Sequence, residues 1–108
     1  ETKLNKLKRN FDAVQIEKRL LKRRQAELLI RLNATRIPVP PQVSDYTKPD
    51  GSADPRAYDL AFKNYEEQKK QYDRIVNYIN NELSQISDKM KNIDEKILQI
   101  QIDLSELI

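Results

Sequence analysis

The feature that most constrains this chain is a seven-residue repeat of apolar side chains in its C-terminal half. One set of positions recurs at every seventh residue: Tyr58, Tyr65, Tyr72, Ile79, Ile86, Ile93, Ile100 and Leu107. A second set alternates with it at spacings of four and three: Phe62, Lys69, Val76, Leu83, Met90, Ile97 and Leu104. Three or four such heptads already indicate a coiled coil. The sequence therefore predicts one long helix over residues 55–108, with an apolar seam along one face and a single charged interruption, Lys69.

Residues 1–34 carry the same period and predict a first helix. Its seam consists of nine positions: Leu4, Leu7, Phe11, Val14, Lys18, Leu21, Gln25, Leu28 and Leu32. A second, weaker apolar stripe lies off this seam and contains Ala13, Ile16, Leu20 and Ile30. A helix that is apolar on two faces belongs in a bundle of more than two helices.

Residues 35–54 separate the two helices and hold four of the five prolines and the only glycine. The prolines within residues 38–41 restrict the backbone and bias it toward extended conformations, so the first helix must stop before them. Residues 48–51 have the proline and glycine spacing of a type I turn. Asp54 is a good N-cap and Pro55 suits the first helical position, so the second helix is expected to begin there.

These patterns predict an all-α antiparallel coiled-coil hairpin with an extended second helix, as part of an oligomeric bundle. The alternative is a three-helix bundle in which Ser87 caps a third helix. If the first helix packs against the residues that directly follow the loop, Lys18 and Gln25 lie opposite the stretch from Tyr65 to Tyr72. That register also brings basic flanking residues of helix 1, Lys8 and Lys22, toward acidic ones of helix 2: Asp59, Glu66 and Asp73.

With this register the hairpin ends near residue 86, and residues 87–108 extend beyond it without an intramolecular partner. Burial of one Ile or Leu side chain contributes about 1.5–3 kcal/mol, so a fully exposed seam is unfavourable. The sequence therefore predicts that this extension mediates assembly or docking, through copies of the chain or a helical protein partner. The expected interface residues are Met90, Ile93, Ile97, Ile100, Leu104 and Leu107.

The charge distribution suggests a second class of function. Residues 1–36 hold eleven Lys and Arg against four acids, whereas the whole chain has a net charge of +3. A basic helix of this kind can contact phosphates, and helix geometry turns Arg9, Arg19 and Arg23 outward. Nucleic-acid binding or a regulatory accessory role is the alternative to a solvated basic face that pairs with the second helix, and the solvated face is favoured.

Composition argues against most other functions. The chain has neither Cys nor His, which removes thiol nucleophiles, the commonest general base and the commonest metal ligands. The aspartates of the loop, Asp45, Asp50 and Asp54, lack the ligand spacing of a calcium loop and suit turns and caps instead. The Pro38-x-x-Pro41 spacing is explained by helix termination without a proline-recognising partner. We therefore expect no enzyme, no cofactor, no metal site and no small-molecule ligand.

The distribution of apolar residues along the sequence also indicates whether a membrane partner is expected and which location is favoured. No apolar run approaches the ~20 residues of a membrane span, and no signal peptide is visible, so no membrane partner is expected and an intracellular location is favoured.

Overall fold

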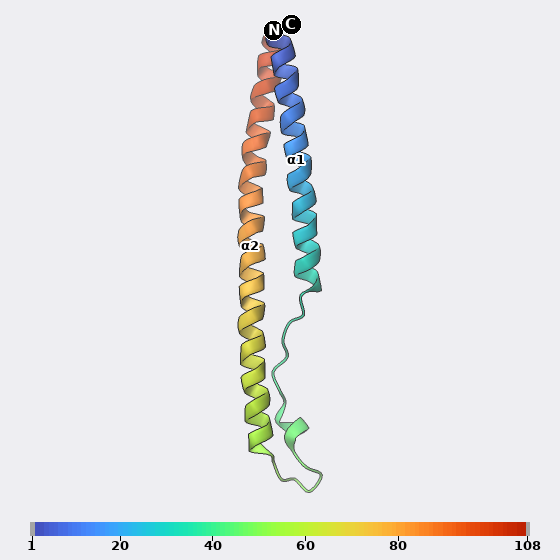
Figure 1. Cartoon of the computed structure of the whole chain (residues 1–108), viewed down its shortest axis with the longest axis vertical. Coiled ribbons are helices and arrows are strands. Elements are labelled where there is room, and N and C mark those ends of the chain that lie inside the picture. Colours follow the sequence, from blue (N-terminus) through green and yellow to red (C-terminus); the bar gives the residue numbers. More distant parts are fainter. Residues whose placement is uncertain (1, 108) are drawn as a thin grey trace.

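The structure, a computed structural model, describes residues 2–107. Two long helices, α1 (Lys3–Ala34) and α2 (Pro55–Glu106), are joined by a connection that contains a short 3-10 helix, η1 (Val43–Tyr46). The two helices run antiparallel, and the start of α1 meets the end of α2 at one end of the molecule (Figure 1). The molecule measures 86 by 18 by 16 Å. The predicted all-α hairpin is therefore confirmed.

The helix ends follow the local sequence. Asp54 caps α2 by accepting a hydrogen bond from the Ala57 N–H at 3.2 Å, and Pro55 occupies the first helical position. α1 ends at Ala34, ahead of the prolines. In residues 2–107, α2 continues through Ser87 without a break, so the three-helix alternative is not observed.

The pairing of the helices differs from the predicted register. The Lys18 ammonium lies 2.6 Å from the Asp94 carboxylate, and the Arg24 guanidinium lies 3.1 Å from the Glu82 carboxylate. α1 therefore packs against the C-terminal part of α2, and Lys18 faces Asp94 rather than the stretch near Lys69. The prediction that residues 87–108 extend beyond the hairpin is wrong over residues 87–107, and Ile108 lies outside the described residues.

The length of the connection explains this difference. The prediction assumed that α1 must pack against the first residues after the loop, as it would after a tight turn. A connection of 20 residues can span up to about 66 Å when extended, so it can run along α2 before the chain reverses. α2 is 20 residues longer than α1, which corresponds to about 30 Å of helix. The connection, rather than α1, lies along this additional length of α2.

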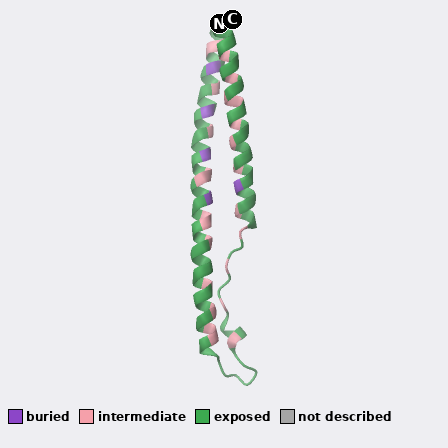
Figure 2. Ribbon diagram, in the orientation of Figure 1, coloured by how far each residue is buried: buried purple, intermediate pink, exposed green. Residues whose placement is uncertain are grey.

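The buried positions lie on the facing sides of the two helices (Figure 2). In the described chain they are Leu28 of α1 and four isoleucines of α2: Ile79, Ile86, Ile93 and Ile100. These isoleucines belong to the predicted seam and follow one another at intervals of seven residues, so the predicted inward face of α2 is confirmed. Leu21, Leu32 and Leu83 pack against the cluster that Leu28 forms with Ile79 and Ile86.

The connection lies against the N-terminal part of α2. Residues 35–39 line a shallow groove together with Tyr72 and Ile75 of α2. Farther along, the ring of Tyr46 in η1 meets the ring of Tyr58 edge-on, with centroids 6.0 Å apart. The extended proline segment and η1 thus take the place of a second helix over this part of α2.

The predicted turn at the tip of the connection forms. The Gly51 N–H donates a hydrogen bond to the Lys48 carbonyl at 2.9 Å. Gly51 has φ of +86°, which glycine adopts without the steric cost that other residues meet. The Lys48 N–H then donates to the Ser52 carbonyl at 2.7 Å, which closes a small hairpin between Thr47 and Ala53.

The observed register can be tested by cross-linking, because the chain contains no native cysteine. We expect a short bismaleimide to join the paired variant Lys18→Cys/Asp94→Cys within one chain. The control, Lys18→Cys/Lys69→Cys, represents the register expected from a tight turn and should stay unlinked. Mass spectrometry of the intact and digested protein reads out the linkage. Efficient linkage of the control pair alone would contradict the structure.

The core can be tested with two matched leucine substitutions on α1. Leu28 is 1% exposed and Leu20 is 60% exposed. Leu28→Ala should lower the free energy of unfolding by about 2–5 kcal/mol, because it leaves a cavity in the core. Leu20→Ala should lower it by less than about 1 kcal/mol. Urea denaturation followed by circular dichroism measures both, and equal effects would show that the core lies elsewhere.

Candidate functional site

Five of the six residues expected to form an intermolecular interface lie on the face of α2 that packs against α1. Ile93 and Ile100 are buried, whereas Met90, Ile97 and Leu104 are half-buried. Leu107, at the end of the helix, is 45% exposed. The stripe therefore has an intramolecular partner, and no second chain is needed to cover it. Binding of a second chain by these residues stays a prediction, but it no longer follows from an uncovered apolar stripe.

The second apolar stripe of α1 is the surface that the hairpin leaves uncovered. We call Ala13, Ile16, Leu20 and Ile30 the outer stripe. All four side chains are exposed, and Ile16, Leu20 and Ile30 retain 53%, 60% and 69% of their accessible surface. Their spacing places them on the side of α1 away from the seam. The prediction that α1 has a second apolar face is confirmed.

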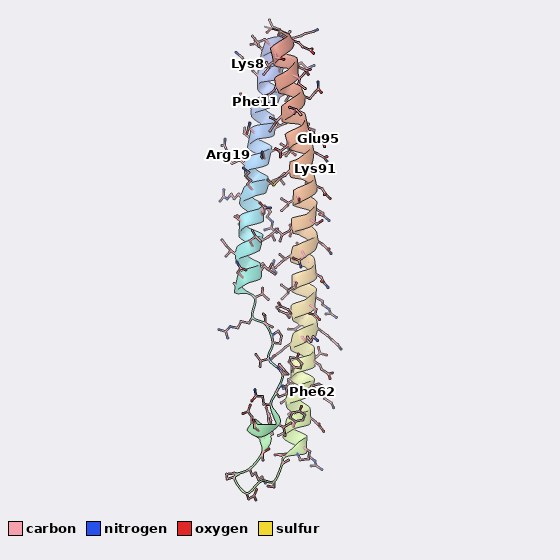
Figure 3. All side chains as sticks on the ribbon, turned by 180° about the vertical axis from the view of Figure 1, so that it is seen from behind. Lys8, Phe11, Arg19, Phe62, Lys91 and Glu95 are labelled. Carbon is pink, nitrogen blue, oxygen red and sulfur yellow. The ribbon has the colours of Figure 1, made fainter. Side chains whose placement is uncertain are left out.

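The three arginines predicted to face outward lie along the same side of α1. Arg9, Arg19 and Arg23 are all exposed. Figure 3 shows Arg19 on the side of α1 that points away from α2. The Arg23 guanidinium lies 3.6 Å from the Glu27 carboxylate one turn farther along the helix. The arginines and the outer stripe thus share one surface.

The charges that flank the seam pair differently from the prediction. Arg24 donates from Nε and Nη2 to the Glu82 carboxylate at 3.1–3.3 Å. The hydrogen bonds and the charge of Glu82 raise the pKa of Arg24. The predicted pairing of Lys8 and Lys22 with the acidic residues between positions 59 and 73 is wrong, because α1 lies against another part of α2.

The aromatic residues of α2 form a ladder near the tip of the hairpin. The rings of Tyr58 and Phe62 are stacked with centroids 6.2 Å apart, and the Phe62 and Tyr65 centroids are 5.9 Å apart. Together with Tyr46 they make a continuous ring cluster, in which Tyr58 and Tyr65 are half-buried, as their seam positions predict. Tyr78 lies off the seam and is 54% exposed. The contribution of Tyr46 had no periodic signal in the sequence.

The proline segment and the loop aspartates have local structural roles. Pro38 and Pro41 are half-buried, and Pro38 lines the same groove as Tyr72. Asp50 accepts hydrogen bonds from the Ser52 hydroxyl at 2.6 Å and from the Ser52 N–H at 2.9 Å. These roles are the turn and capping functions that the sequence favours for this segment.

A further exposed apolar pair lies on α2 and was not singled out from the sequence. Leu98 and Ile102 are one helical turn apart and are 57% and 44% exposed. The connection adds Ile37, Val39 and Val43, which are 71%, 76% and 61% exposed. The four-residue spacing of the α2 pair was a signal available in the sequence, whereas the exposure of the loop residues depends on how the connection lies on α2.

Comparisons with known proteins add no relative: no family model, no curated protein and no solved structure matches this chain. Over the described residues, neither helix is both long and apolar enough to cross a membrane. The fold and its exposed surfaces define the molecule as an elongated two-helix hairpin.

The turn at the tip should depend on pH through Asp50. Hydrogen bonds from Ser52 hold the pKa of Asp50 below its ordinary value of 3.8. The ionised carboxylate therefore supports the turn above that value, and this support is lost as the pH falls through the lower pKa of the folded chain. An NMR titration of the Asp50 carboxyl carbon should have its midpoint below 3.8 in the native chain. In Ser52→Ala the midpoint should move upward, and an unchanged midpoint would contradict the contact.

Proposed function

We propose that this chain is a non-enzymatic interaction module, a coiled-coil hairpin that mediates oligomerisation or helix–helix docking in a larger assembly. The observation that carries the proposal is the large number of exposed apolar side chains on a thin, extended fold. These side chains lie on the outside of α1, on the outside of α2 and along the connection. Apolar surface on several sides is typical of helices that pack against further helices.

The dimensions of the chain support the same proposal. Its accessible surface is 8759 Å², whereas a compact monomer of 12.8 kDa would expose about 6,300 Å². Its radius of gyration of 25.6 Å is roughly twice the 13 Å of a compact domain of this length. The excess of about 2,500 Å² is comparable to the area buried in a stable protein–protein interface. Association would therefore bring the surface of this chain closer to that of an ordinary folded protein.

The seam residues of α1 and α2 pack against each other within the hairpin. A docking partner would therefore contact the remaining exposed apolar surfaces. The paired helices form a rod, since α2 alone spans about 78 Å. The start of α1 and the end of α2 lie together at one end of this rod, and the proline-rich connection lies toward the other end (Figure 1). A rod with apolar side chains along its length suits a structural element that packs against other helices.

The first test is the molar mass of the chain in solution, measured by light scattering over a range of concentrations. A mass of two to four chains supports self-assembly. A mass near 12.8 kDa at all concentrations excludes self-assembly and leaves docking to a different protein to be tested. A panel of helical peptides with one apolar face, differing only in whether Glu, Gln or Lys flanks that face, then tests docking directly.

We expect either self-association or binding of at least one peptide of this panel. A peptide of the same length with serine at every apolar position is the control for charge alone. A chain that stays monomeric and binds none of the three apolar peptides would contradict an interaction function.

A further inference from the structure

We propose that the outer stripe of α1 is a docking surface for an amphipathic helix whose apolar face is flanked by acidic side chains. This inference rests on the proposed interaction function and names the surface and the chemistry of its partner. It begins from Ile16 and Leu20, which lie one helical turn apart on the outside of the hairpin and are 53% and 60% exposed. Ala13 and Ile30 continue the same face in the two directions.

The spacing of these residues matches the recognition of a helix. Ala13, Ile16 and Leu20 follow one another at intervals of three and four residues, which lines them up on one side of α1. Apolar residues at this spacing on one helix pack against apolar residues at the same spacing on another. The partner is therefore expected to present a short run of apolar side chains along one helical face.

The charges around the stripe determine the expected sign of the partner. α1 contains ten Lys and Arg and three acids between Lys3 and Ala34, so the helix has a net charge of +7. Arg19 forms no ion pair with any residue that the structure describes. Arg23 lies beside the stripe with its side chain 79% exposed. Acidic side chains on a docking helix would find these cations at the edge of the apolar contact.

The same surface is less suited to nucleic acid. Phosphate recognition requires cations and polar donors, and it gains nothing from covering Ile16 and Leu20. Here the aliphatic side chains lie between Arg9, Arg19 and Arg23 along the helix. An acidic amphipathic helix satisfies both the apolar side chains and the charges, whereas a polyanion satisfies the charges alone.

A second copy of the chain is also a poorer match. Two α1 helices would bring two faces of positive charge together, since each helix carries +7. The outside of α2 offers only Leu98 and Ile102 as large exposed apolar residues in its C-terminal half, and their charged neighbours are the acidic Glu95 and Glu106 and the basic Lys91. This pair is shorter than the outer stripe, and the charges at its edge are of both signs.

The test measures binding of the three apolar peptides with Glu, Gln or Lys flanks to the full chain by fluorescence anisotropy. We expect the Glu-flanked peptide to bind at least about tenfold more tightly than the Lys-flanked one. The double variant Ile16→Ser/Leu20→Ser should weaken that binding at least about tenfold. The matched control, Leu98→Ser/Ile102→Ser, removes an equally exposed apolar pair from α2 and should bind as the native chain does.

The charge requirement is tested with Arg19→Glu/Arg23→Glu, which should reverse the preference so that the Lys-flanked peptide binds more tightly. Lys63→Glu/Lys91→Glu changes the net charge equally on α2 and should leave the preference unchanged. All four variants alter exposed side chains, and thermal unfolding followed by circular dichroism checks that the hairpin is intact.

Several outcomes would overturn this assignment and leave the interaction function standing. One is equal binding of the Gln-flanked or Lys-flanked peptide, and another is unchanged binding by Ile16→Ser/Leu20→Ser. Equally tight binding of duplex DNA, or of the Glu-flanked peptide with serine in place of its apolar residues, would identify a polyanion site. A native oligomer that becomes monomeric in Ile16→Ser/Leu20→Ser would identify a second copy as the occupant. A native chain that binds none of the three apolar peptides and does not self-associate would instead refute the proposed function.

Discussion

The structure depends on the contact between the seam of α1 and the isoleucine half of α2. Four isoleucines at successive heptad positions provide a continuous aliphatic row, and Leu28 fits into it near Ile79 and Ile86. No comparable row exists in the first part of α2, where the same positions are tyrosines. Aliphatic packing on this row fixes where α1 lies along α2, and the pair between Lys18 and Asp94 agrees with that position.

The position of α1 determines the role of the connection and of the exposed surfaces. Because α1 lies beside the last part of α2, the connection must follow the remaining part of α2, and its prolines favour the extended path that this requires. Tyr58 consequently meets Tyr46 of the connection, and Tyr72 shares a groove with residues 35–39, in place of contacts with α1. The seam of α1 is used within the chain, which leaves the outer stripe as the apolar face of that helix that can meet another molecule.

Several elements follow from short-range patterns and were predicted correctly. The heptad positions of α2, the cap at Asp54 and the turn closed at Gly51 depend on residues within a few positions of one another. The register was predicted wrongly because it depends on residues far apart in the sequence, such as Lys18 with Asp94, 76 positions apart, and Arg24 with Glu82, 58 positions apart. A seven-residue repeat also permits other registers offset by whole heptads, so periodicity could not choose among them. The outer stripe and its arginines could be predicted from the sequence. The packing of α1 over residues 90–107 could not.

The sequence by itself determined that this chain forms two long helices with one apolar seam each, where these helices begin and end, and that α1 is basic and apolar on a second face. Only the tertiary structure decided which part of α2 covers the seam of α1, and therefore which apolar residues remain exposed. The physical reason is that helix formation and amphipathicity are set by neighbours one or two turns away. Register is instead set by the fit of whole faces and by the path available to a connection of 20 residues.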